Sequence, residues 1–291
     1  MSLTVIIPTR GRPGLLLKTV ASCLHNAASY NTKVLVCVDE DDVETQTALE
    51  QALVGLKPDG QLIVSVRPRE DTRGEKYDRA LTEAPGSVYL LGVDAAPILT
   101  LGYDEIILNA ANLFPDNIGC VYTPMANASF PSYQAPTAGL VEKLGGCYSR
   151  EYPFWFIDHE LDDICRMIGR YVCVDIDVDC HSMRPGKTIR LRELEFWTKY
   201  YDVMTLERRL KARSIIMSPD FQAPDWQKTM LCNAYQPIES RSYWINNNVR
   251  VQAAEIEKLR GDPGPPDEGY LRAKAKAEQK LTTTYAALKA A

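Results

Sequence analysis

The sequence lacks several features that define large classes of protein. No apolar run approaches the ~18–20 residues that a membrane-spanning helix needs. Residues 1–10 lack the basic region followed by a long apolar stretch that marks a signal peptide. Neither of the glycine-rich phosphate patterns, GxxxxGK[ST] or GxGxxG, follows the first apolar segment. These absences argue against a membrane-spanning protein, a secreted protein, a P-loop nucleotidase and a dinucleotide-dependent enzyme.

Paired cysteines and a surplus of positive charge are also absent. The eight cysteines form no CxxC pair, which predicts free thiols in a reducing, cytoplasmic compartment and argues against a thiolate zinc site. The formal net charge of −5 disfavours nucleic acid as a partner. With 45% hydrophobic and 24% charged residues, the 291-residue chain has the composition of an ordinary globular protein and excludes disorder as its main state.

Short apolar segments alternate with segments of helical periodicity along the first half of the chain. Strands are predicted at residues 3–8, 33–38, 62–66, 87–93, 118–122 and 171–179, and residues 73–82 form one of the predicted helices. Because the early strands are continuously apolar, the pattern predicts an α/β fold with a mostly parallel sheet flanked by helices. Residues 123–153 are expected to be irregular. We divide the chain into an α/β domain at 1–215 and a helical C-terminal extension at 216–291.

Charged side chains follow the predicted strands. The first strand is followed by the segment TRGR at residues 9–12, the second by DEDD at 39–42, and the fourth by Asp94. The carboxyl ends of parallel strands meet at one edge of a sheet, where ligands bind. Carboxylates can hold a divalent cation there and arginines can hold phosphate oxygens, so the pattern suits a metal-bound phosphate ligand. The alternative is that these residues are the ordinary charges of solvated loops.

Three segments, taken in order, resemble glycosyltransferase family 2. They are LTVIIPTRGRP at residues 3–13, VCVDEDD at 36–42 and YLLGVD at 89–94, and the resemblance covers roughly residues 3–185. It implies a GT-A-like fold, which is Rossmann-like, and inverting transfer of a sugar from a nucleotide-sugar, most commonly a UDP-sugar. The acceptor would be a hydroxyl of a glycan or another molecule.

The same resemblance implies a nucleotide-sugar site. Asp39, which ends the second strand, would contact the nucleotide base. The other residues assigned to this site are Pro8, Thr9, Arg10, Arg12, Arg73 and Lys76. An exposed helix face would explain Arg73 and Lys76 equally well.

A divalent metal, Mn²⁺ or Mg²⁺, is the cofactor that the resemblance implies. Asp94 matches the last aspartate of the family's metal motif, but residues 92–96 contain only this one aspartate where family members have two or three. His181 resembles a late histidine ligand of some members, and it shares strand parity with the acidic residues at 175, 177 and 179. A solvated acidic strand face is the alternative for this segment.

A carboxylate near the acceptor hydroxyl is needed as general base. The segment FWFIDHEL at residues 154–161 resembles the family segment that supplies it, with Asp158 as the first candidate and Glu160 as the second. An ordinary helix start explains both residues too, because Asp is a good N-cap and Glu suits a first turn.

Two other functions remain open at the level of the sequence. A sugar nucleotidyltransferase would carry a glycine-rich basic loop after the first strand, of which residues 9–12 are a poor version. A non-catalytic module that binds a nucleotide-sugar or a glycan is favoured by the reduced metal motif.

Overall fold

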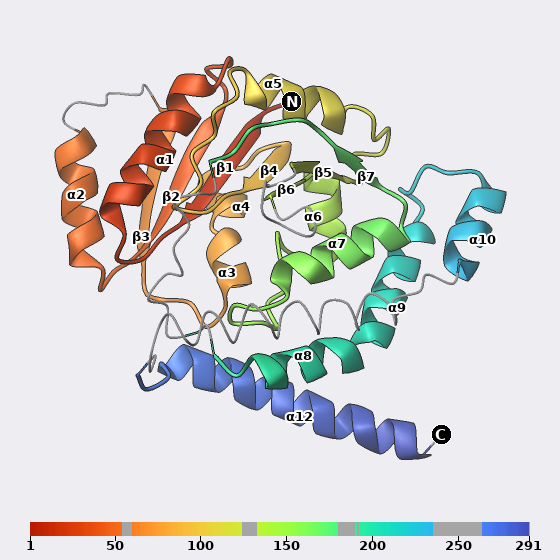
Figure 1. Cartoon of the computed structure of the whole chain (residues 1–291). Coiled ribbons are helices and arrows are strands. Elements are labelled where there is room, and N and C mark those ends of the chain that lie inside the picture. Colours follow the sequence, from red (N-terminus) through yellow and green to blue (C-terminus); the bar gives the residue numbers. More distant parts are fainter. Residues whose placement is uncertain (54–59, 124–132, 180–189, 191, 235–263, 291) are drawn as a thin grey trace. The chain divides into compact units, whose positions relative to one another are not determined.

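The computed structural model describes residues 1–53, 60–123, 133–179, 190, 192–234 and 264–290. The chain forms two compact units (Figure 1). The first, here called the sheet unit, comprises residues 1–69, 75–148 and 170–184. The second, the helical unit, comprises residues 70–74, 149–169 and 185–291. Each is described by itself.

A four-stranded parallel sheet forms the centre of the sheet unit. Its strands lie in the order β3-β2-β1-β4, with β1 at Leu3–Pro8, β2 at Lys33–Asp39, β3 at Leu62–Arg67 and β4 at Val88–Leu91. All of β1 and β4, and all of β2 beyond Lys33, are buried, as expected for strands covered on both faces. The predicted parallel sheet is therefore confirmed. In the register, Pro8 pairs with Cys37 and Asp39 with Arg67, which places the carboxyl ends of these strands at one edge.

Helices connect these strands, namely α1 (Pro13–Asn26), α2 (Val43–Leu53), α3 (Arg73–Tyr77) and α4 (Ala80–Glu83). A further helix, α5 (Tyr103–Ala111), follows β4 and leads to the second sheet. Leu16, Val20 and Cys23 of α1 are fully buried in the core with the strands. The single helix predicted over residues 73–82 is wrong, because the chain turns between α3 and α4 at Asp78 and Arg79. Arg79 points inward there and bonds strand carbonyls, which a straight helix with an exposed arginine would not allow.

A second, three-stranded sheet contains β5 (Cys120–Thr123), β6 (Tyr133–Pro136) and β7 (Tyr171–Cys173) in the order β6-β5-β7. β6 is antiparallel to β5, and β7 is parallel to it. The expectation of an irregular segment at 123–153 is thus corrected, since β6 and α6 (Ala138–Leu144) lie within it. β6 is only four residues long and entirely buried, so it offers no alternation that a sequence pattern could detect.

The segment after β7 is extended but leaves the sheet sooner than predicted. Regular pairing ends at Cys173, and the chain then bridges through Val178 to Ile98. The predicted alternation is confirmed, because Ile176 and Val178 are buried while Asp175 and Asp177 are exposed. The acidic residues therefore share a solvated face.

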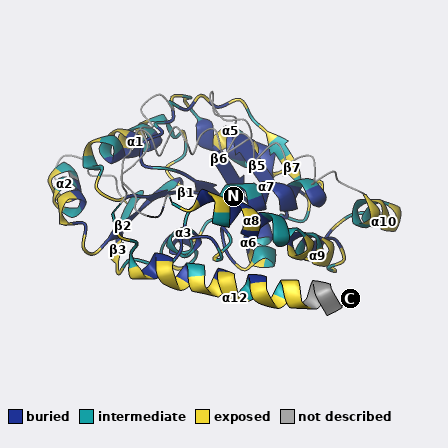
Figure 2. Cartoon of the chain, turned by 60° about the horizontal axis from the view of Figure 1, so that its bottom comes forward, coloured by how far each residue is buried: buried dark blue, intermediate teal, exposed yellow. Residues whose placement is uncertain are grey.

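The helical unit is built from α7 (Ile157–Met167), α8 (Leu194–Val203), α9 (Thr205–Ile216), α10 (Asp225–Asn233) and α12 (Glu268–Ala290). One face of α12 is buried through Tyr270, Ala273, Ala277 and Leu281, and the other is exposed (Figure 2). Tyr270 accepts a hydrogen bond of 3.1 Å from the Trp197 indole of α8. α12 lies within the predicted helical C-terminal extension and is helical as expected. None of the helices in the described ranges is both long and apolar enough to cross a membrane.

Asp104 holds the connection between α1 and β2 in place. It lies in the first turn of α5 and is fully buried. Its carboxylate accepts hydrogen bonds from the backbone N–H groups of Ala28 (2.8 Å) and Ser29 (2.9 Å) and from the Thr32 hydroxyl (2.6 Å). One side chain thus satisfies three donors, two of them backbone amides that have no helix or strand partner.

We expect Asp104→Ala to lower the free energy of unfolding by about 2–4 kcal/mol, because it leaves buried donors without an acceptor. Urea denaturation of the full chain measures the loss. Glu105→Ala is the matched control, since Glu105 is the next residue of the same helix and is exposed. Equal stability of the two variants would contradict the role given to Asp104.

Candidate functional site

Three polar residues lie at the carboxyl ends of neighbouring parallel strands. Thr9 follows β1, Asp39 ends β2 and Asp94 follows β4. Asp39 and Asp94 are each only 1% exposed. Because a buried carboxylate requires charged or hydrogen-bonding partners, the side chains around these two aspartates define the site.

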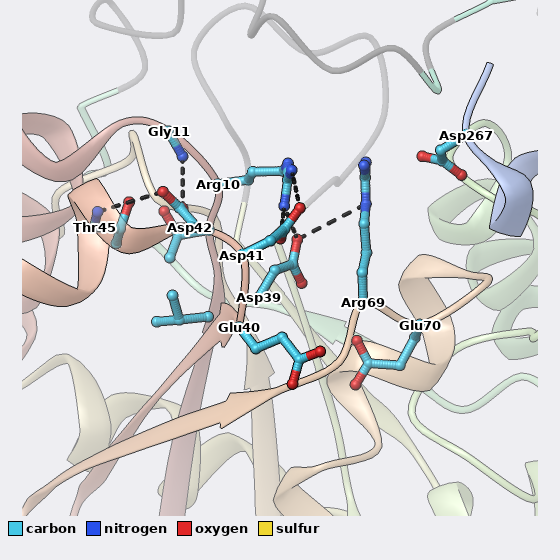
Figure 3. Close-up of polar contacts among 12 residues, drawn as sticks. Arg10, Gly11, Asp39, Glu40, Asp41, Asp42, Thr45, Arg69, Glu70 and Asp267 are labelled. Atoms are coloured by element: carbon cyan, nitrogen blue, oxygen red, sulfur yellow. Dashed lines mark hydrogen bonds and ion pairs between the residues drawn. The ribbon is translucent and has the colours of Figure 1, made fainter. Parts of the chain in front are cut away.

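Asp39 is surrounded by cations. Lys76 donates to its Oδ1 at 2.6 Å and to the Thr9 carbonyl at 3.1 Å. Arg10 donates to Oδ2 at 3.0 Å, and the Arg69 Nε lies 3.8 Å from the same oxygen (Figure 3). Burial lowers the pKa of Lys76, and the Asp39 charge opposes that shift only in part. Both Asp39 oxygens are engaged, so a nucleotide base would have to replace one of these cations to contact Asp39.

The loop at residues 9–12 is fixed by the acidic segment after β2. The Arg10 guanidinium also pairs with both oxygens of Asp41, at 2.5 and 2.7 Å, which raises the pKa of Arg10 and lowers that of Asp41. Asp42 accepts from the Gly11 N–H at 2.8 Å and from the Thr45 N–H at 3.3 Å (Figure 3). Gly11 has a φ of 65°, a conformation that favours glycine. The loop's shape therefore depends on Asp41 and Asp42.

Asp94 is paired with Arg12. The Arg12 Nε donates to Oδ2 at 3.1 Å, and Nη2 lies 2.5 Å from Oδ1. The Thr9 hydroxyl donates to Oδ2 at 3.0 Å, and the Thr19 hydroxyl donates to the Asp94 carbonyl at 3.2 Å. The Asp94 side chain is 2% exposed while that of Arg12 is 32% exposed. The pair thus joins a buried anion to a cation that reaches solvent.

The donor set around Asp94 does not fit a divalent cation in this arrangement. Both Asp94 oxygens contact Arg12, and the adjacent residues at 93, 95 and 96 are Val, Ala and Ala, whose side chains offer no ligand. Within the described ranges, no three His, Cys, Asp or Glu side chains are grouped as a metal site would require. His181, the other predicted ligand, lies outside the described residues.

The predicted general base and Arg73 lie in the helical unit. Asp158 is in the first turn of α7, and its side chain is 32% exposed. Its Oδ1 accepts from the His159 N–H at 2.9 Å and lies 2.9 Å from the His159 Nδ1. Burial alone would raise the pKa of Asp158, but the interactions with His159 and the charge of Arg73 outweigh it and hold the pKa below the ordinary value. Asp158 therefore stays ionised at neutral pH.

Glu160 lies in the same turn but in a different environment. It is 8% exposed, and burial raises its pKa although Lys211 and Arg208 oppose the shift. Of the two candidates, Asp158 has the more accessible carboxylate.

The structure thus groups the predicted residues into two sets. The sheet unit brings together Pro8, Thr9, Arg10, Arg12, Asp39, Lys76 and Asp94. The helical unit holds Arg73, Asp158 and Glu160.

Arg79 is a residue of the site that the sequence did not indicate. It is 3% exposed, and its Nη1 donates to the carbonyls of Val38 and Ser65, each at 2.9 Å. It therefore fixes the carboxyl ends of β2 and β3, beside Asp39. Nothing in the sequence separates a buried arginine from an exposed one at this position, so only its place close after the third strand could have drawn attention to it.

Comparison with known proteins shows the fold. No family model and no curated protein matches the sequence. Among solved structures, the chain resembles a mannosyltransferase, PcManGT from Pyrobaculum calidifontis, in complex with GDP-Man and Mn²⁺. The TM-score is 0.54 at 18% identity, over 99% of this chain and 80% of that one. It also resembles S. aureus TarS residues 1–349 in complex with UDP, with a TM-score of 0.50 at 14% identity, over 96% and 92% of the chains. The chain has a GT-A-type α/β fold, as predicted.

Replacing Lys76 tests the pairing of Asp39. We expect Lys76→Met to lower the free energy of unfolding by about 1–3 kcal/mol, the range for losing a hydrogen bond to a charged group, while Arg10 still pairs with Asp39. Lys18→Met, on the exposed face of α1, is the matched control. A Lys76 variant as stable as the Lys18 variant in urea would show that the lysine does not hold Asp39.

Proposed function

We propose that this protein is a glycosyltransferase that transfers a sugar from a nucleotide-sugar to an acceptor hydroxyl. The observation that carries the proposal is the arrangement of Asp39 and Asp94 at the carboxyl ends of β2 and β4, each paired with arginine or lysine, in a GT-A-type sheet. Ligands of parallel α/β sheets bind at this edge. The order of the sequence segments that resemble glycosyltransferase family 2 supports the same assignment.

The donor's diphosphate is the group that the basic side chains suit. Arg10, Arg12 and Lys76 lie on the loop after β1 or beside it, and guanidinium groups bind phosphate oxygens with directed N–H donors. We assign the nucleotide base to Asp39 and propose a UDP-sugar as donor. The TarS structure to which the chain is similar contains UDP, while the mannosyltransferase structure contains GDP-Man.

Asp158 is proposed as the general base of an inverting displacement. The acceptor oxygen attacks the anomeric carbon while the bond from that carbon to the diphosphate oxygen breaks. The hydroxyl proton passes to Asp158, and the electron pair of the broken bond leaves with the nucleoside diphosphate. An ionised and partly exposed carboxylate suits this role better than the buried Glu160.

Mn²⁺ or Mg²⁺ bound by Asp94 and His181 stays a prediction from the resemblance. The similar mannosyltransferase structure contains Mn²⁺. The displacement described above is derived from residues of this chain and does not depend on a metal.

Release of nucleoside diphosphate tests the function without a known acceptor. Water can take the place of the acceptor hydroxyl and slowly hydrolyse the nucleotide-sugar, which releases the same diphosphate. We expect the purified chain to release UDP or GDP from at least one member of a panel of UDP- and GDP-sugars. A chain that binds a nucleotide-sugar but never releases the diphosphate would instead be a binding module, and a chain that binds none would contradict the proposal.

Replacing Asp39 tests the base contact. We expect Asp39→Ala to weaken UDP binding by ~1–3 kcal/mol in isothermal titration, the scale of a hydrogen bond to a charged group. Glu40→Ala is the matched control, because Glu40 is adjacent and exposed. Asp39→Asn, which keeps the side-chain shape, separates base recognition from a change in folding. Unchanged affinity in both Asp39 variants would reject the assignment.

Replacing Asp158 and following the pH dependence tests the general base. Asp158→Asn should lower turnover ~100-fold or more with donor affinity nearly intact, because only proton transfer is lost. In the wild type, turnover should fall only below the ordinary aspartate range, since the base must be ionised and its pKa is lowered.

Glu160→Gln is the control for that series. If Glu160 were the base, its variant would lose the turnover, and the acid limb of the wild-type profile would lie above the ordinary glutamate range, because its pKa is raised. Those two results together would assign the general base to Glu160.

A further inference from the structure

We propose that the Arg12 guanidinium, fixed on Asp94, is the cation that binds the donor's diphosphate, so that donor binding needs no divalent metal. The inference rests on the proposed function and deepens it. It departs from the metal site that the family resemblance implies.

The first support is the way Asp94 holds Arg12. The carboxylate is 2% exposed and touches the guanidinium through both oxygens, with 3.1 Å from Nε to Oδ2 and 2.5 Å from Nη2 to Oδ1. The Thr9 hydroxyl adds a third contact at 3.0 Å. A two-point pair fixes the plane of the guanidinium, which a single contact would leave free to rotate. A metal ion that bound Asp94 would therefore compete with Arg12 for the same two oxygens.

The second support is the scarcity of oxygen ligands. Mg²⁺ requires six ligands in near-octahedral geometry, and protein carboxylates are its usual anchors. Residues 92–96 supply one carboxylate, that of Asp94. Asp39 does not replace a second one, because Lys76 and Arg10 engage its two oxygens. The carboxylates of Asp39 and Asp94 are therefore held by cations rather than left as ligands for a metal ion.

The third support is the position of Arg12 itself. It precedes Pro13 at the start of α1, a helix of fourteen residues, whose positive end favours an anion. The pair with Asp94 uses Nε and Nη2, and Nη1 makes no hydrogen bond to the residues that the structure describes. The side chain is 32% exposed. Nη1 is therefore available to a phosphate oxygen.

The pair is electrically neutral as a whole, so its action differs from that of a metal. A divalent ion on one carboxylate would carry net positive charge, whereas Arg12 on Asp94 offers directed N–H donors at a fixed place. Negative charge grows on the diphosphate as its bond to the anomeric carbon breaks, and fixed donors stabilise that charge without reorganising. Arg10, on the same loop, and Lys76 of α3, which donates to the Thr9 carbonyl, are further cations beside the Arg12–Asp94 pair, and both pair with Asp39.

Isothermal titration with UDP and GDP, in EDTA and in Mn²⁺, tests the proposal on the full chain. We expect one of the two nucleotides to bind the wild type with equal affinity in both conditions, within about twofold. Arg12→Gln should weaken that binding in EDTA by roughly 10- to 100-fold, the range for charged hydrogen bonds. Arg12→Lys should recover only part of it, because an ammonium cannot make the two-point pair. Lys18→Gln, exposed on α1, is the matched control and should bind as the wild type does.

Three results would overturn the inference. Binding that requires Mn²⁺, or that Mn²⁺ strengthens tenfold or more, would restore the metal site and leave the proposed function intact. If Arg12→Gln bound the nucleotide in EDTA as tightly as the wild type does, Arg12 would not be the cation that binds the diphosphate. Failure of the wild type to bind either nucleotide in either condition would overturn the inference together with the proposed function.

A measurement on the wild type alone tests the same proposal even if the Arg12 variants do not fold. The electron paramagnetic resonance signal of free Mn²⁺ falls when the ion binds a protein. We expect adding the protein to a solution of Mn²⁺ and the bound nucleotide to leave that signal at the level given by the nucleotide alone. A further fall, saturating at one ion per chain, would show a protein metal site and contradict the inference.

Discussion

The burial of two carboxylates at one edge of a parallel sheet is the constraint on which the rest of the site depends. Asp39 ends β2 and Asp94 follows β4, the two strands that flank β1 in the sheet, and each aspartate is 1% exposed. A buried carboxylate is stable only if cations or hydrogen-bond donors are fixed against it. Lys76 and Arg10 are therefore held on Asp39, and Arg12 is held on Asp94. The two aspartates thus place a set of cations where a parallel sheet binds its ligands.

The proposed donor site and the proposed base differ in the charges around their carboxylates. At the sheet edge, Arg10 and Lys76 pair with Asp39 and Arg12 pairs with Asp94, and these cations suit the anionic diphosphate that we propose as ligand. In the helical unit, Asp158 has its pKa lowered by His159 and Arg73 and remains partly exposed, which suits a group that must be ionised before it takes a proton. Glu160, two residues further along α7, is buried, and burial raises its pKa.

The sequence predicted correctly those features that depend on the pattern of adjacent residues. Continuous apolar runs predicted β1, β2 and β3 and the parallel sheet, and the polar residues that follow the runs predicted the aspartates at the edge. It failed where tertiary contacts decide. β6 is too short and too buried to show a pattern, and the turn between α3 and α4 depends on Arg79 bonding carbonyls of two other strands. The pairing of Arg12 with Asp94 joins residues 82 positions apart, so no local pattern could reveal it.

A crystal structure of the full chain with UDP or GDP in the presence of EDTA would show whether Arg12 binds the diphosphate without a metal ion. We expect electron density for the nucleotide at the carboxyl ends of β1, β2 and β4, with a phosphate oxygen within hydrogen-bond distance of Arg12 and no ion between the diphosphate and Asp94. A nucleotide bound elsewhere, or one bound at this edge only after Mn²⁺ is added and with Arg12 displaced from Asp94, would contradict this proposal.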